Sequence, residues 1–394
     1  MPAAQPAFAL FDPPEFRFLC DCLASPSPDG RLLAHQASDF DWGLFLNLCR
    51  RHSVRPLVYR ALSLADWQGV PSHIQHTLQQ FIAQNSRRNS LLSLELVRII
   101  TKLNDSSIPS STFKGPTLAQ SVYGNVGLRE FLDLDLIVRP VDVLQVRRIL
   151  SADGYETKHF DRNTDDYREE SGQATFVRPN AGWGLDLHWK LAPFGMRFPF
   201  SEGEIWRSLQ PLPLANGNVP CLAWDQMALF LAFHGAKERW RSLKWICDFA
   251  ALAHTRTELD WESLHRRAAA NHCSRALLVA ARLCESLSLS APPVLLDKGR
   301  NDARVQSIVD RILRRLAFPV PETDLSMFSD SLATTERLRD KIQLTLTLFT
   351  TLTASDYAAV RLPAPLHGIY YLMRPFRLAA KVASLLCQRF RAAR

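Results

Sequence analysis

The stretch Phe113–Val138, FKGPTLAQSVYGNVGLREFLDLDLIV, holds the residues around which we expect the fold to be built. Near its end, acidic and apolar residues alternate, and the side chains of a β-strand alternate between its two faces. A strand here places Asp133 and Asp135 on one face and the three neighbouring leucines on the other. The stretch therefore predicts a strand with a buried apolar face and a carboxylate pair on its reverse.

A carboxylate pair of this kind has two interpretations. Like charges about 5–6 Å apart repel by roughly 3 kcal/mol at an effective dielectric near 20, and a divalent cation removes that cost. Carboxylate oxygens are ligands that suit Mg²⁺, or Mn²⁺. The alternative is an edge strand with two hydrated acids, because D-x-D is a short and frequent motif. The residues around the pair bear on this choice.

The residues before the pair predict a strand, a glycine turn and a helix. Ile108–Phe113 has the composition of a short strand and ends at Lys114 and Gly115, while Pro116–Tyr123 reads as a helix with proline in its first turn. The first N–H groups of a helix attract anions, and Lys114 adds a positive charge there. This turn is therefore a candidate anion site.

Two further segments carry polar groups of the kind that such a site needs. The run Gly184–Trp189 alternates, so that Asp186 and His188 share one face and Asp186 becomes a third carboxylate. His188 either orients a carboxylate through a hydrogen bond or contacts a metal directly. Arg129 either reaches a phosphate or forms a salt bridge that fixes its loop.

The order of these motifs resembles a known family. Lys114-Gly115, then R-x-x-x-D-L-D-L-I-V from Arg129 and L-D-L-H-W from Leu185, is similar to the uncharacterised bacterial nucleotidyltransferase family of the polymerase beta superfamily. Further motifs at residues 42–57 and 234–248 extend the resemblance over most of residues 40–255.

The resemblance implies a metal-assisted transfer in which two magnesium ions, held by three carboxylates, bind a nucleoside triphosphate such as ATP. Asp133 and Asp135 match the paired metal ligands, and Asp186 matches the acid that orients or deprotonates the acceptor. Gly115 matches the turn on the phosphate side. A helical domain in the superfamily offers basic side chains to the triphosphate, and Lys237 is the candidate here. The alternative is an ordinary solvated polar stripe, whose members recur at three- and four-residue steps: His234, Lys237, Arg241, Lys244 and Asp248.

Length and composition set the domain organisation. A chain of 394 residues with 47% hydrophobic and 22% charged residues is typical of a globular protein with two or three domains. We expect an α+β fold with an N-terminal helical region over residues 1–104. A small mixed-sheet nucleotidyltransferase core follows over 105–210, and a C-terminal helical domain over 211–394.

The net charge of +8 favours an anionic partner, whether nucleotide, nucleic acid or membrane surface. An RNA-directed transferase is one alternative function, and it predicts salt-sensitive RNA binding. The stretch Met373–Arg394 is basic and amphipathic. It predicts either peripheral contact with an anionic membrane or, as the favoured interpretation, a packed helix with a solvated basic face.

The remaining observations concern location and catalytic competence. The eight cysteines have no C-x-x-C spacing, the N-terminus lacks a secretion signal, and no run of eighteen apolar residues occurs, so a soluble cytoplasmic protein is expected. Pro116 and Thr117 stand where the superfamily has a small hydroxyl residue directly after the glycine. A non-catalytic nucleotide-sensing or interaction module is therefore a further alternative, although three retained acids favour catalysis. The acceptor is a small molecule, a sugar or a protein side chain.

Overall fold

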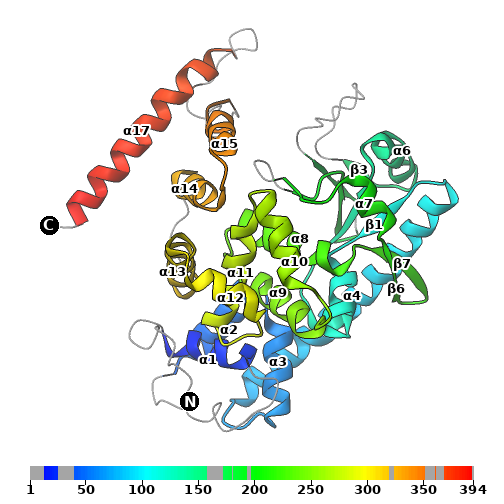
Figure 1. Ribbon diagram of the computed structural model, residues 1–394. Coiled ribbons are helices and arrows are strands. Elements are labelled where there is room, and N and C mark those ends of the chain that lie inside the picture. Colours follow the sequence, from blue (N-terminus) through cyan, green and yellow to red (C-terminus); the bar gives the residue numbers. More distant parts are fainter. Residues whose placement is uncertain are drawn as a thin grey trace. The chain divides into compact units, whose positions relative to one another are not determined.

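The structure is a computed structural model that describes residues 13–24, 40–157, 172–179, 181–192, 197–318, 324–350, 360 and 368–392 (Figure 1). Its contacts divide the chain into two compact units. The first unit is Met1–Pro193 with Arg197–Val320, and the second is Phe194–Met196 with Pro321–Arg394. The three regions expected from the sequence are a different division and stay a prediction.

The first unit begins with helices, as the sequence predicts. The long helix among them, α4, carries apolar residues at three- and four-residue steps, the spacing that keeps one face of a helix apolar. These residues, which include Leu92, Leu96 and Leu103, are buried. The helices of this segment are α1 (Pro14–Ala24), α2 (Trp42–Arg51), α3 (Arg55–Leu64) and α4 (Ser72–Asp105).

A seven-stranded mixed sheet follows, in the order β3-β4-β5-β2-β1-β7-β6. Strand β2 runs parallel to β5, β1 runs parallel to β7, and the other neighbours are antiparallel. The strands are β1 (Ser110–Thr112), β2 (Asp133–Val138), β3 (Glu156–Thr157), β4 (Gln173–Val177), β5 (Gly184–His188), β6 (Gln210–Leu214) and β7 (Gly217–Cys221). The helices between them are α5 (Gly115–Tyr123), α6 (Val143–Ala152) and α7 (Glu202–Arg207).

One face of this sheet forms the hydrophobic core. The leucines of β2 and β5 that alternate with the acids lie in one buried cluster with residues of α4 and α6, as the alternation predicts. Each fully buried leucine contributes about 1.5–3 kcal/mol. Leu132 was expected on this face, but it precedes the first residue of β2 and is 60% exposed. The core members from these strands and from α6 are Leu134, Leu136, Leu185, Leu187, Val143, Val146 and Leu150.

The hairpin of β6 and β7 is not among the strands predicted from the sequence. Three prolines, Pro211, Pro213 and Pro220, lie in these strands, and proline in a run argues against a central strand. Strand β6 is an edge strand, where proline is tolerated. The dipeptide Asn216-Gly217 between two short runs is a hairpin signal that could have found it.

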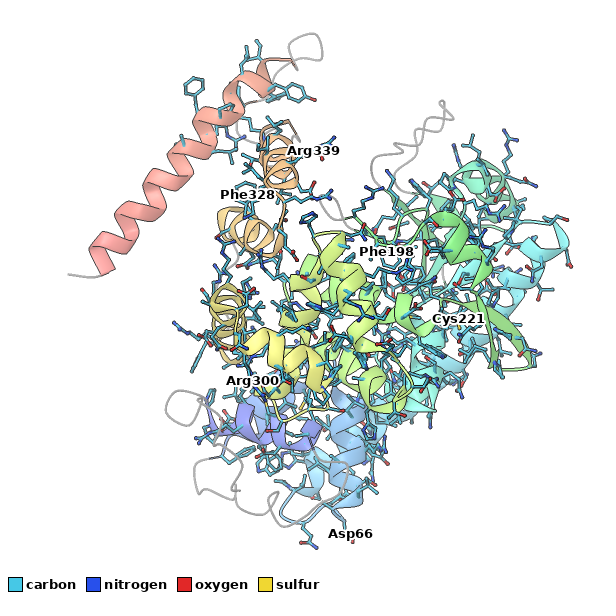
Figure 2. The ribbon with its side chains drawn as sticks, in the orientation of Figure 1. Asp66, Phe198, Cys221, Arg300, Phe328 and Arg339 are labelled. Atoms are coloured by element: carbon cyan, nitrogen blue, oxygen red, sulfur yellow. The ribbon has the colours of Figure 1, made fainter. Side chains whose placement is uncertain are left out.

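The rest of the first unit is helical. Cys221, labelled in Figure 2, ends β7 opposite Thr112 of β1, and α8 starts three residues later. The helices are α8 (Trp224–Lys237), α9 (Leu243–Thr255), α10 (Trp261–Ala270), α11 (Ser274–Ser286), α12 (Pro293–Arg300) and α13 (Ala303–Ala317). The α+β class, a mixed sheet with helical segments before and after it, is thus confirmed.

The described part of the second unit consists of α14 (Asp324–Thr334), α15 (Leu338–Thr350) and α17 (Ile369–Ala392). The helix expected near the C-terminus is α17, which begins four residues before the predicted stretch. Within the described ranges of the whole chain, no helix is long and apolar enough to cross a membrane.

Candidate active site

Asp135 lies at the centre of the polar groups on the reverse face of the sheet. Its side chain is 2% exposed, and its Oδ1 accepts hydrogen bonds from Lys114 Nζ at 2.6 Å and from His188 Nε2 at 3.2 Å. Burial alone would raise the pKa of Asp135, but the charge of Lys114 and the hydrogen bond from His188 outweigh it and hold that pKa well below its ordinary value. Asp135 is therefore ionised over the whole physiological pH range.

Asp186 lies beside Asp135 because β2 and β5 are parallel and in register. Asp135 is opposite Asp186, and Ile137 is opposite His188. The hydroxyl of Thr175, on the other neighbouring strand, donates to Asp186 Oδ1 at 2.7 Å. Strand pairing thus brings together the two acids that lie 51 residues apart (186 − 135 = 51) in the sequence.

Asp135, Asp186 and His188 form a group that could hold a metal ion. One possible ligand atom of each residue lies within 4.8 Å of those of the other two. Among the residues that the structure describes, this is the group of three such side chains that meets this distance. Two carboxylate oxygens and an imidazole nitrogen suit Mn²⁺ and, through the oxygens, Mg²⁺. The donor set therefore fits a divalent cation.

Asp133 is on the same strand face but outside that group of three. It begins β2, lies opposite Gly184, and is exposed. Desolvation of its carboxylate, with the negative charge of Asp135, raises the pKa of Asp133 above its ordinary value. Desolvation is the larger cause of the raised pKa, and the carboxylate repulsion expected from the sequence adds to it.

Gly115 begins α5 directly beside the first residue of β2. Its φ of +52° lies in the left-handed region, which favours glycine. A Cβ at this position would lie 3.3 Å from the backbone oxygen of Asp133, closer than ordinary contact. The glycine thus allows the start of the helix to approach the acidic strand.

Lys114 precedes this turn and points to the acids. Its ammonium nitrogen is 5.6 Å from the centroid of the Phe113 ring and 5.5 Å from that of Phe230, in addition to its contact with Asp135. Thr117, in the first turn of α5, is turned elsewhere, because its hydroxyl is hydrogen-bonded to that of Thr112 at 2.9 Å in the interior. At this turn the side chain directed to the acids is therefore that of Lys114, next to Gly115, and not a hydroxyl group.

Arg129 forms a salt bridge, which is one of the two roles that the sequence leaves open for it. Its guanidinium is buried and donates to both carboxylate oxygens of Asp248 on α9, at 2.9–3.1 Å. Tyr123 donates to the same carboxylate at 3.0 Å. The amides of Asn85 and Asn89 bind the carbonyl of Arg129. These contacts fix the segment that leads into β2.

Two lysines of the C-terminal helices lie near the same sheet. Lys237, at the end of α8, is exposed and donates to Gln173 at 3.3 Å, and Gln173 is opposite His188 in the sheet. Lys244 donates to the carbonyl of Glu130 at 3.4 Å. Burial and the charge of Arg129 lower the pKa of Lys244, against the opposite effect of Asp248 and Asp133. The sequence placed Lys244 in the same polar stripe as Lys237 but gave no reason to select it.

The fold and this group of side chains define an α+β protein with a carboxylate site on adjacent parallel strands. A family model described as uncharacterised nucleotidyltransferase matches residues 38–288, more than half of the chain. The chain therefore belongs to this family, as its motifs predict.

One solved structure among those that match is the solution structure of the antibiotic-resistance factor ANT(2'')-Ia. It is 15% identical, the match covers 46% of this chain and 91% of that chain, and the TM-score is 0.33. A likeness of this size carries no conclusion about the site. The comparison with curated proteins gave no match.

Proposed function

We propose that this protein transfers a nucleoside monophosphate from a nucleoside triphosphate to an acceptor, with Mg²⁺ or Mn²⁺ as cofactor. The observation that supports this most is the pairing of Asp135 with Asp186 on parallel strands, with Lys114 in contact with Asp135. Membership in a nucleotidyltransferase family supports the reaction class.

Asp135 and Asp186 are the proposed metal ligands, together with Asp133 from the same face of β2. His188 joins them or orients Asp135. A bound divalent cation would neutralise charge on the phosphate oxygens of the donor. The low pKa of Asp135 keeps this ligand ionised, whereas the raised pKa of Asp133 makes it easier to protonate than Asp135 as the pH falls.

Lys114 and the Gly115 turn are the proposed contacts of the triphosphate. An ammonium group has three N–H donors, of which Asp135 accepts one, so that Lys114 can also pair with a phosphate oxygen. The first N–H groups of α5 are a second source of donors. Lys237 is a further proposed phosphate contact, whereas Arg129 is committed to Asp248 and serves to hold the loop before β2.

Asp186 is the proposed base toward the acceptor. Thr175 donates to Oδ1 and holds the carboxylate in one orientation, which leaves Oδ2 to accept a proton. The acceptor is a small molecule, a sugar or a protein side chain. Proton acceptance by a positioned carboxylate typically contributes about 10²–10⁴-fold to a rate.

The test is calorimetric titration of each of the four nucleoside triphosphates into the full chain, with and without Mg²⁺. We expect metal-dependent binding that disappears in Asp133→Asn/Asp135→Asn. The matched control is Asp66→Asn, an exposed acid in a turn after α3, labelled in Figure 2. Absence of binding for all four triphosphates, or equal binding by the double variant, would overturn the proposal.

A second candidate function is nucleotide sensing without transfer. It is favoured by Thr117, whose hydroxyl is bonded to Thr112 and is not directed to a ligand at the glycine turn. The two candidates differ in turnover. Release of pyrophosphate from the bound triphosphate, in the presence of candidate acceptors, supports transfer; binding without release supports sensing.

A further inference from the structure

Helix α17 has one face turned to protein and one face of apolar side chains turned to solvent. Tyr370 and Arg374 are buried, and the Tyr370 hydroxyl donates to the carbonyl of Val360 at 2.7 Å. Leu372 and Phe376 are 71% and 78% exposed. Residues 370 and 374 are four apart, as are 372 and 376, so that each pair occupies its own side of the helix.

These exposed side chains are large and form part of a stripe. Ile369 precedes Leu372 by three residues, Phe376 follows it by four, and all three are exposed. This is the spacing of one helical face. Tyr371 is also exposed and adds an aromatic ring that has a polar end. An exposed cluster of large apolar residues usually marks a contact surface.

The same helix is strongly basic. From Ile369 to Ala392 its sequence has no aspartate or glutamate, and it has the basic residues Arg374, Arg377, Lys381, Arg389 and Arg391. Arg374 lies on the buried face, so the charge open to a partner comes from the basic residues nearer the C-terminus. A partner of this helix must therefore offer an apolar layer to the exposed stripe and negative charge to those residues. Duplex nucleic acid supplies the charge but no apolar layer. The bases of a single strand stack on aromatic rings, whereas two of the three stripe residues, Ile369 and Leu372, are aliphatic.

We propose that α17 docks on the surface of an anionic phospholipid membrane, with Leu372 and Phe376 inserted at the level of the headgroups. A helix that is basic, amphipathic and of low mean hydropathy, with leucine and aromatic residues on its apolar face, is the type that lies in a membrane interface. Anionic headgroups match its charge at about 1 kcal/mol per basic residue near the surface.

A second apolar stripe lies in the same unit. Leu338, Ile342 and Leu346 of α15 are exposed and recur at four-residue steps, and α15 packs against α17. The second unit thus contributes apolar surface from two helices. This inference does not depend on the proposed nucleotidyl transfer, because it concerns residues outside the first unit.

The test is flotation of the full chain with two kinds of vesicle. One kind is phosphatidylcholine alone, and the other is phosphatidylcholine with about 30% phosphatidylglycerol. We expect binding to the anionic vesicles that weakens at high salt, and much weaker binding to the neutral ones. In Leu372→Gln/Phe376→Gln the lipid concentration for half-maximal binding should rise by about tenfold or more, because apolar surface is lost from the contact. The matched control is Leu64→Gln/Leu91→Gln, which removes two exposed leucines of the first unit and should bind as the wild type does.

Three results would overturn the proposal. One is the absence of binding to anionic vesicles, and another is equal binding by Leu372→Gln/Phe376→Gln. The third is a wild-type dimer in sedimentation velocity without lipid that becomes monomeric in this double variant, since the stripe would then belong to a contact between two copies. Nucleotide titrations of the same variant should match the wild type, which separates this test from that of the active site.

Discussion

Gly115 and Asp133 approach so closely that a methyl group on Gly115 would lie 3.3 Å from the backbone oxygen of Asp133. This contact joins the start of α5 to the first residue of β2. It therefore sets the distance between the turn that carries Lys114 and the strand that carries the acids.

Substitution of this glycine should damage both stability and the site. Gly115→Ala places a side chain at φ +52° and against the backbone of β2, and such backbone strain costs about 1–3 kcal/mol. We expect a loss of that size in urea unfolding and weaker triphosphate binding. Gly124→Ala is a suitable control, since it also has positive φ but no atom within 4 Å of the added Cβ. Equal binding by both variants would contradict the role given to the contact.

Thr175 should act on Asp186 as a positioning residue. Thr175→Val keeps the shape of the side chain but removes the hydrogen bond of 2.7 Å to Oδ1. We expect turnover to fall about tenfold or more, with an unchanged KM for the triphosphate, because a hydrogen bond to a charged group contributes about 1.5–3 kcal/mol and roughly 1.4 kcal/mol is a factor of ten. Thr175→Ser, which keeps the hydroxyl, should restore most of the rate. A normal rate in the valine variant would exclude the role.

The buried pair of Arg129 and Asp248 should matter chiefly for stability. Asp248→Asn leaves the buried guanidinium without its charge partner, a change that costs about 3–5 kcal/mol. Glu238→Gln, which breaks the partly exposed pair with Arg241, should cost below about 1 kcal/mol. Urea unfolding measures both. Similar losses in the two variants would show that burial of the first pair has no special effect.

His52 should make the first unit less stable as the pH falls. Its Nε2 lies 3.2 Å from the carbonyl of Leu316, and its Nδ1 lies 3.4 Å from the N–H of Leu243, an arrangement that fits the neutral ring with the proton on Nε2. Burial, with the charge of Arg51, lowers the pKa of His52 to about 3.

Between that value and the ordinary pKa near 6.5, the unfolded chain binds a proton that the folded chain does not, so stability rises with pH across this window. From pH 7 to pH 5 His52 should cost about 2 kcal/mol of unfolding free energy. His52→Gln should flatten this part of the pH profile, measured by urea unfolding at each pH. An unchanged slope in the variant would contradict the assignment.

The sequence predicts the local elements of the site because their signals are local. The alternation around Asp133 and Asp135 identifies β2, and proline after a glycine identifies the start of α5. The pairing of Asp135 with Asp186 depends on which strands are neighbours, and spacing alone does not specify this. Family resemblance, and not periodicity, indicated that the three acids belong together.

Other features could not be predicted from the sequence, for physical reasons. Asp248 is 119 residues from Arg129, and it appeared in the sequence as one member of a polar stripe when in fact it is fully buried. The hairpin of β6 and β7 contains prolines, which favour a loop interpretation. His188 could be placed beside Asp186 on one strand face, but its hydrogen bond to Asp135 crosses to the neighbouring strand.

The most direct test of the metal site is a titration of Mn²⁺ into the full chain followed by electron paramagnetic resonance, with a non-hydrolysable triphosphate present. Mn²⁺ takes the same oxygen ligands as Mg²⁺ and is visible to this method. The proposed site predicts bound Mn²⁺ in the wild type and in Asp66→Asn, and its loss in Asp135→Asn and in Asp186→Asn. Retention of the bound ion in both of these variants would contradict the assignment of Asp135 and Asp186 as metal ligands.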